Sequence, residues 1–135
     1  MKSLDTNVLA RFFIDDTDDP QAVKQRPAAI CAMLDRSFVS ITVVLEFEWV
    51  MRGFYKMTRV EITSVFNALV GIAHITLEDR VAVLAAIDAY QQGLDFSDAL
   101  HHAKSARCIE LLSFDKAFFK RAKVLGTLPT VMLLV

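Results

Sequence analysis

The stretch MKSLDTNVLARFFI (Met1 to Ile14) begins like a strand, continues like a helix, and has an aspartate at the junction. Residues 1–5 are typical of a short strand. The apolar residues that follow have helical spacing: Val8, Leu9, Phe12 and Phe13. Because strand-like and helix-like stretches keep alternating along the chain, the sequence predicts an α/β fold with a central parallel sheet and helices on both faces.

The remaining elements follow from periodicity and from breaks at proline, glycine and polar runs. Helices are expected at about Gln21 to Arg36 (with Pro27 splitting it), Val43 to Tyr55, Arg59 to Val70, Leu77 to Gly93, Phe96 to Arg107 and Lys116 to Ala122. Further strands are expected at 37–42, 73–76, 110–114 and 130–134. The 135 residues contain no repeat, low-complexity segment or linker, so we expect a single domain over 1–135.

Composition restricts the class of protein. Apolar residues make up 54% and charged residues 23%, which excludes a disordered chain, and the apolar surplus suggests a protein partner. The net charge of −1 gives no overall signature of nucleic-acid binding, so any cations that contact RNA must be local. No apolar run is long enough to span a membrane, and the N-terminus does not resemble a signal peptide. Cys31 and Cys108 form no CxxC pair, and we expect reduced core cysteines in a cytoplasmic protein.

Two acids stand at the ends of predicted strands. Asp5 ends the first strand, and Asp115 ends the strand in LLSFD. Ligands of open α/β sheets bind beyond the carboxyl ends of strands, so both acids are candidate site residues. The alternative for each is an ordinary helix N-cap.

Two glutamates lie in the predicted helix at Val43 to Tyr55. Glu48 has Arg52 four residues on, which predicts an ion pair on a solvated face. Glu46 has Val43, Trp49 and Val50 at its helical spacings, and an acid on an apolar stripe is costly unless something compensates it. Glu46 is therefore the candidate site residue, with a hydrogen-bonded acid at the edge of the stripe as the alternative.

The stretch GLDFSDALHH (Gly93 to His102) carries another pair of acids. Asp95 stands where an N-cap is expected and Asp98 follows at the third helical position. Zinc bound by Asp98, His101 and His102 is an alternative, but no cysteine or further histidine is placed to help. The remaining acids are hard oxygen ligands, which select Mg²⁺ or Mn²⁺: Asp5, Glu46, Asp98 and Asp115.

Four blocks in this order resemble the PIN domain family, most closely its VapC-like toxin ribonucleases: LDTNVLARFF, SITVVLEFEWVMRGFY, GLDFSDALHHAKSA and LLSFDKAF. The resemblance spans nearly the whole chain. It implies that the catalytic and metal-binding acids are Asp5, Glu46, Asp98 and Asp115. It also implies supporting roles for Thr6, Asn7 and Ser113, while Asp95 matches a position that is often acidic.

The resemblance implies a metal-dependent endoribonuclease that acts as the toxin of a toxin–antitoxin pair. Its implied partners are RNA, an antitoxin protein and a second copy of the chain, with operator DNA bound only through the antitoxin. The shortness of the chain favours this interpretation. Cations that flank the acidic blocks are candidates for RNA contact: Arg11, Arg52, Lys56, Arg59 and Lys116.

Other functions stay open at this stage. A PIN nuclease of RNA processing is one, and a phosphotransfer or phosphatase domain is another, although Asp5 is followed by Thr6 and Asn7 rather than by the Asp-x-Asp of haloacid-dehalogenase-like enzymes. A receiver domain would carry an acidic pair before its first helix. A catalytically dead interaction module would not need four acids.

Overall fold

The computed structural model describes all residues 1–135, and they form two compact units, residues 1–80 and residues 81–135. All strand pairs are parallel and helices separate the strands along the chain, so the predicted parallel α/β fold is confirmed. The strands form a three-stranded sheet in the first unit and a two-stranded sheet in the second. That the two units make up a single domain stays a prediction.

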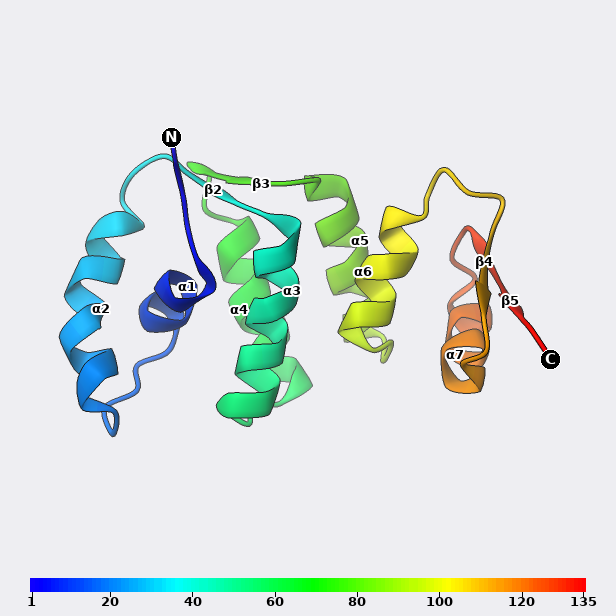
Figure 1. Ribbon diagram of the computed structural model, residues 1–135, viewed down its shortest axis with the longest axis horizontal. Coiled ribbons are helices and arrows are strands. Elements are labelled where there is room, and N and C mark those ends of the chain that lie inside the picture. The colour runs from blue at the N-terminus through cyan, green and yellow to red at the C-terminus, as the bar shows by residue number, and fades with distance from the viewer. The chain divides into compact units, whose positions relative to one another are not determined.

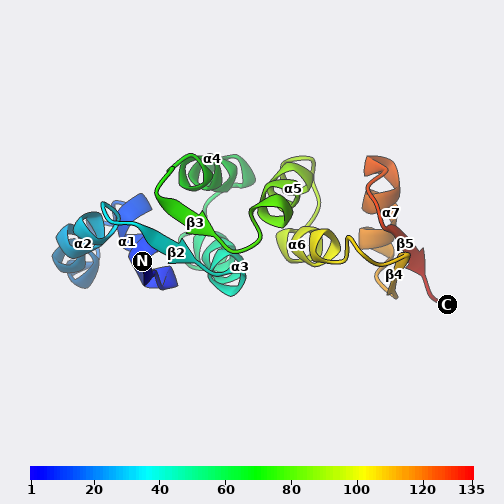
Figure 2. The same cartoon turned by 90° about the horizontal axis from the view of Figure 1, so that it is seen from above.

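Unit 1 is built around the sheet β1-β2-β3. Its elements are β1 (Lys2–Ser3), α1 (Thr6–Phe13), α2 (Pro20–Ala32), β2 (Ser37–Val39), α3 (Ile41–Trp49), η1 (Val50–Phe54), α4 (Arg59–Val70) and β3 (Ile75–Leu77). Lys2 is paired with Ser37, and Phe38 with Thr76. Helix α2 packs on α1, and β3 lies between α3 and α4 in Figure 2. In Figure 1 the helices of this unit lie below its strands.

The core of unit 1 is rich in phenylalanine. The ring of Phe47 on α3 lies 6.0 Å from that of Phe13 and 6.1 Å from that of Phe66 on α4, measured between centroids. Phe47 and Phe66 are fully buried, together with Leu9 of α1. These side chains pack α1, α3 and α4 against one another.

Unit 2 contains α5 (Arg80–Gln91, of which Arg80 belongs to unit 1), α6 (Phe96–Lys104), β4 (Glu110–Ser113), α7 (Lys116–Leu125) and β5 (Thr130–Leu133) (Figure 1). Strand β4 pairs with β5, with Leu111 opposite Val131. Tyr90 of α5 and Phe96 of α6 make an edge-to-face contact at 5.5 Å. His102 of α6 is buried, and its Nε2 is bonded to the carbonyl oxygen of Pro129 (2.6 Å).

Several predicted boundaries were wrong. The strand expected at 37–42 stops at Val39, because the Ser40 hydroxyl accepts a hydrogen bond from the Val43 N–H and begins α3 at Ile41. Helix α2 is not split: Pro27 lies inside it and is exposed, where water can reach the carbonyl left without a donor. Both cysteines are free, as expected, but exposed rather than in the core.

Candidate functional site

Asp5 connects β1 to α1. It is the N-cap of α1, and its Oδ1 accepts a hydrogen bond from the Thr6 N–H (2.8 Å). The residue is exposed, so Oδ2 stays open to solvent or to a ligand. Thr6 is buried and its hydroxyl has no hydrogen-bond partner, whereas Asn7 is exposed. Asp5 therefore caps the helix with one carboxylate oxygen and leaves the other available.

The two glutamates of α3 have exchanged the environments that the sequence predicted. Glu48 is buried, with its side chain only 3% exposed, and Arg52 Nε donates to its Oε2 (3.0 Å) and Oε1 (3.3 Å). The Glu48–Arg52 pair is confirmed, but its carboxylate end lies in the core. Glu46 is exposed, and its carboxylate makes no hydrogen bond or ion pair.

The cause of this exchange is the face of α3 that packs inward. Val44, Phe47, Glu48 and Met51 are buried and follow one another at helical spacing, so Glu48 lies on the core stripe. The apolar stripe beside Glu46 faces outward, where Trp49 is 60% exposed. The prediction that Glu46 lies on a buried stripe was wrong. Its exposure nevertheless leaves its carboxylate free to bind a ligand.

Asp95 and Asp98 open α6. Asp95 is its N-cap, and Asp95 Oδ2 accepts a hydrogen bond from the Asp98 N–H (3.1 Å). The capping role predicted for Asp95 is confirmed. The Asp98 carboxylate is half-buried and has no hydrogen-bond or ion-pair partner of its own.

Asp115 is held in the same way at the start of α7. Its Oδ1 accepts from the Phe118 N–H (3.0 Å), and its own N–H donates to the Ser113 hydroxyl (3.0 Å). Ser113 ends β4 and fixes the backbone of Asp115 where the strand turns into the helix. This contact is consistent with a positioning role for Ser113.

The charges of neighbouring acids in unit 2 affect the pKa of Asp98. Burial raises the pKa of the Asp98 carboxyl above its ordinary value of 3.8, and the charges of Asp95 and Asp115 raise it further, while His101 opposes them. A divalent cation would remove this repulsion, and carboxylate oxygens are the ligands that Mg²⁺ and Mn²⁺ prefer. The donor chemistry of Asp98 and Asp115 therefore fits such an ion. Within neither unit do three or more His, Cys, Asp or Glu side chains come together as a metal site.

The histidines do not form the alternative zinc site. His102 is bonded to the Pro129 carbonyl and buried, and His74 Nε2 is bonded to the Met33 carbonyl (2.6 Å) in unit 1. Both imidazoles have structural partners. His101 is exposed and acts on Asp98 only through its charge.

Two of the cations suggested for RNA contact are engaged within the protein. Arg11 donates to Gln25 (2.9 Å) and to the Tyr55 hydroxyl (3.0 Å), and Arg52 is paired with Glu48. Lys116, by contrast, is the first residue of α7 and is exposed. Of these three, Lys116 is best placed to meet a ligand.

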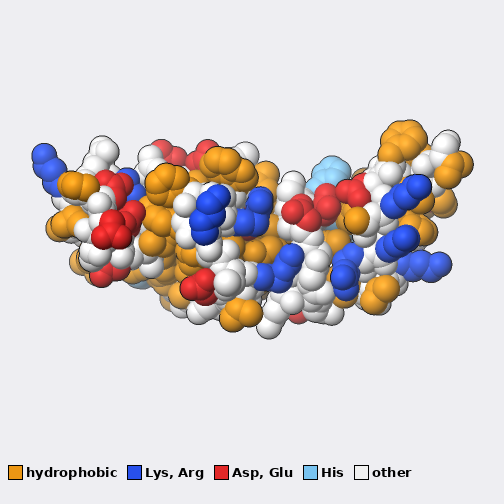
Figure 3. Space-filling model, turned by 90° about the horizontal axis from the view of Figure 1, so that it is seen from below, with side chains coloured by type: hydrophobic (Ala, Val, Ile, Leu, Met, Phe, Trp, Pro, Cys, Tyr) orange, Lys and Arg blue, Asp and Glu red, His pale blue; other side chains and the backbone are white.

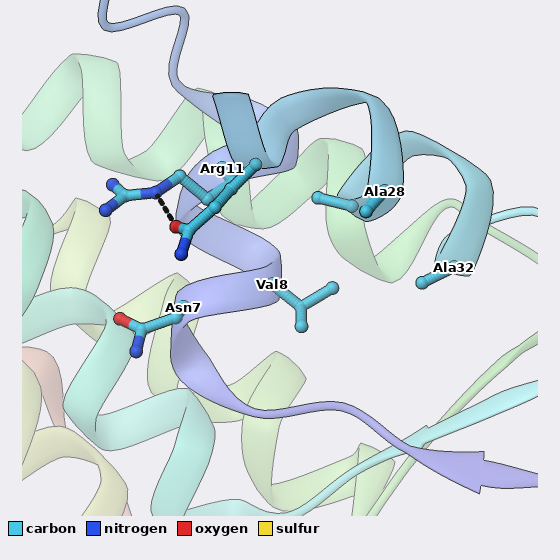
Figure 4. Close-up of a pocket in the computed structure, with 7 residues that line it drawn as sticks. Asn7, Val8, Arg11, Ala28 and Ala32 are labelled. Atoms are coloured by element: carbon cyan, nitrogen blue, oxygen red, sulfur yellow. Dashed lines mark hydrogen bonds between the residues drawn. The ribbon is translucent and has the colours of Figure 1, made fainter. Parts of the chain in front are cut away.

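Arg11 also borders a cavity of about 240 Å³ between α1 and α2 (Figure 4). Its lining residues are Asn7, Val8, Arg11, Gln25, Ala28, Ala29 and Ala32. The alanines of α2 leave room opposite Val8, and the polar groups of Asn7 and Arg11 lie at the side of α1. The cavity is mostly apolar and begins two residues after Asp5.

The family follows from a comparison of the whole sequence. The profile of the PIN domain matches residues 3–124. The chain belongs to the PIN domain family. PIN domains have a nuclease fold and generally use divalent metals, so the family points to a nucleic-acid substrate. No match was found among curated proteins or among solved structures. None of the helices of this PIN domain is long and apolar enough to cross a membrane.

Sequence reasoning missed one feature of this region, the burial of the Glu48 carboxylate in its pair with Arg52. The signal was present as the spacing Val44, Phe47, Glu48 and Met51. The same helix has a second apolar stripe through Val43, Trp49 and Val50. Periodicity alone does not show which of the two stripes packs against the core.

Proposed function

We propose that this PIN domain is a metal-dependent endoribonuclease that acts as the toxin of a toxin–antitoxin pair in the cytoplasm. The observation that carries the proposal is the Asp98 carboxylate, which is half-buried, unpaired, and repelled by Asp95 and Asp115. Such a group is poorly stabilised by the protein alone and well stabilised by a cation. Family membership favours a nuclease over a phosphatase or a signalling domain.

In the proposed reaction, the residues that would hold Mg²⁺ or Mn²⁺ are Asp5, Glu46, Asp98 and Asp115. The ion would supply a water of lowered pKa and offset charge on the scissile phosphate. Asp5 offers Oδ2 and Glu46 an unpaired carboxylate, whereas Asp115 keeps Oδ2 free while Oδ1 caps α7. Ser113 acts as a positioning residue for Asp115, and Thr6 and Asn7 follow Asp5 at the start of α1.

Substitution of Asp98 tests the activity. Asp98→Asn should lower metal-dependent cleavage of single-stranded RNA by at least about 100-fold, the effect of removing one transition-state charge contact. Asp88→Asn is the matched control, since Asp88 is an exposed aspartate on α5 of the same unit. Equal cleavage by the Asp98 and Asp88 variants would reject Asp98 as a metal ligand.

Metal binding has a readout that does not need activity. An ion that binds only the folded protein stabilises it by about 2.7 kcal/mol at 100 times its dissociation constant. Thermal melts with chelator and with Mn²⁺ should show this gain in the wild type and a much smaller one in Asp98→Asn. An identical response of the two proteins would mean that Asp98 does not bind the metal and is only a residue of the first turn of α6.

We also propose a homodimer and an antitoxin that places apolar side chains in a groove between helices. The α1–α2 cavity is large enough for an apolar side chain, and it lies close in sequence to Asp5, where an antitoxin Arg or Lys would meet the acids. Exposed apolar side chains of unit 1 support a protein interface: Leu45, Trp49, Phe54 and Val60. The toxin–antitoxin complex would bind operator DNA through the antitoxin.

A substitution that fills the cavity tests antitoxin binding independently of RNA cleavage. Ala28→Phe, on the exposed side of α2, should abolish copurification of the proposed antitoxin and leave RNA cleavage intact. Val23→Phe, at an exposed position of the same helix outside the cavity lining, is the control. A toxin that stays monomeric in light scattering and copurifies with no small protein would count against both partners.

A further inference from the structure

Helix α7 has an unusual charge for a chain whose net charge is −1. Its ten residues, Lys116–Leu125, contain four cations and no acid: Lys116, Lys120, Arg121 and Lys123. Phe118 and Ala122 face the core, so the cations lie on the exposed part of the helix. Figure 3 shows Lys and Arg side chains gathered over the part of unit 2 that carries α7.

The lysines of this helix are not neutralised by the protein. Lys116 and Lys120 are exposed and make no ion pair or hydrogen bond. They are four residues apart on one helical face, an arrangement in which like charges destabilise a helix slightly. An anionic ligand along this face would remove that repulsion.

A large aromatic side chain stands beside the cations. Phe114 follows β4 and is 74% exposed, directly before Asp115. One turn into α7, Lys123 Nζ lies over the ring of Phe119 at 5.9 Å from its centroid. An exposed aromatic ring such as Phe114 and unpaired cations such as Lys116 and Lys120 are the two components of surfaces that bind single-stranded nucleic acid.

We propose that Phe114 and the exposed face of α7 form the binding surface for single-stranded RNA, with one base stacked on Phe114 and phosphates held by Lys116 and Lys120. This surface rests on the proposed function, because it places the bound strand beside Asp115. The strand runs along α7 away from that acid. Since every base has a π-face, the contact is tolerant of sequence, but it requires an unstacked base and so selects single strands over duplexes.

The test measures binding without cleavage. Binding is measured by fluorescence anisotropy of a labelled 12-nucleotide single-stranded RNA in the presence of chelator. Phe114→Ala should weaken this binding by about 5- to 150-fold, because it removes one base-stacking contact. Phe114→Trp keeps a π-face and should keep the affinity. Ile109→Ala removes an exposed apolar side chain without a π-face, from unit 2, and should not change it.

The lysines have a separate signature in the salt dependence. Two lost phosphate contacts should reduce the slope of log K against log salt by about 1.4, because each contact on a single strand contributes about 0.7. The variant is Lys116→Ala with Lys120→Ala. Lys2→Ala with Lys24→Ala removes the same charge from exposed positions of unit 1 and should leave the slope within error.

The outcomes separate this surface from the proposed function. Unchanged RNA affinity in Phe114→Ala, or equal affinity for the single strand and a duplex, would overturn the surface even if Asp98→Asn abolishes cleavage. Unchanged affinity together with loss of the dimer in light scattering would assign Phe114 to a protein interface instead. Binding that depends on Phe114 in a protein without metal-dependent cleavage would support the surface and reject the proposed function.

Discussion

Helix α3 of unit 1 and the start of helix α6 of unit 2 each have two acids close together in the sequence. The environments predicted for the acids of α3 were wrong, whereas the cap predicted at α6 is confirmed. In α6, Asp95 caps the helix as expected and Asp98 remains half-buried and unpaired. In α3, the acid expected on the surface is buried and the acid expected on a buried stripe is exposed.

The difference lies in how far each property depends on distant residues. An N-cap is a contact between a side chain and a backbone N–H three residues away, so the sequence GLDFSD contains both partners. The buried face of α3 is set by Phe13 and Phe66, which come from other helices. Because nearly every position from Val43 to Met51 is apolar, α3 offers more than one stripe that could meet them.

The largest expected effect concerns activity. Glu46→Gln should lower RNA cleavage by about 100-fold or more, because it removes one proposed metal ligand at an exposed position. Glu48→Gln should keep the cleavage rate of each folded molecule, since Glu48 is occupied by Arg52. Rates would be divided by the folded fraction from circular dichroism. An inactive Glu48→Gln beside an active Glu46→Gln would reverse the assignment in α3.

Stability should rank the two glutamates in the opposite order. Glu48→Gln leaves a buried amide in place of a charged partner of Arg52, and we expect a loss of about 1–3 kcal/mol in the free energy of unfolding. The half-exposed Arg52 can be hydrated, which keeps the loss below that of a fully buried pair. Glu46→Gln should change stability by less than about 0.5 kcal/mol. Urea denaturation measures both, and equal losses would contradict the burial difference.

In α6 the effect should be smaller and local. Asp95→Ala removes the acceptor for the Asp98 N–H and should destabilise the protein by about 1 kcal/mol, whereas Asp95→Asn keeps an acceptor and should recover most of it. Urea denaturation of the two variants checks this prediction. A loss in Asp95→Asn as large as in Asp95→Ala would show that the charge, rather than the cap, stabilises the start of α6.

The smallest expected effect is a pH dependence of Asp98. Its pKa is raised above 3.8 by burial and by Asp95 and Asp115, so the folded state binds more protons than the unfolded state. The stability of the metal-free wild type, relative to Asp98→Asn, should therefore be highest at low pH and fall as pH rises above that value. Solvent screens this partly buried carboxyl, so the change is small. Chemical denaturation of both proteins in chelator at several pH values would detect it, and a difference that rises with pH would contradict the coupling.

The sequence by itself determined the parallel α/β class, the order of the elements and the acids at helix starts. These depend on local periodicity and on N-caps such as Asp5, Asp95 and Asp115, whose partners lie within three residues. Four motif blocks in order were enough to indicate the family, and the profile match confirms it over residues 3–124.

Only the tertiary structure decided which side chains are buried and where elements end. Glu48 is in the core because Phe47, on the same face, packs on Phe13 and Phe66, and Val44 and Met51 of that face are buried with it. The strand at Ser37 stops at Val39 because the Ser40 hydroxyl caps α3, and Pro27 stays inside α2 because its side is exposed. Burial is a property of the packed neighbours, and a helix that is apolar on every side does not encode which of its faces they cover.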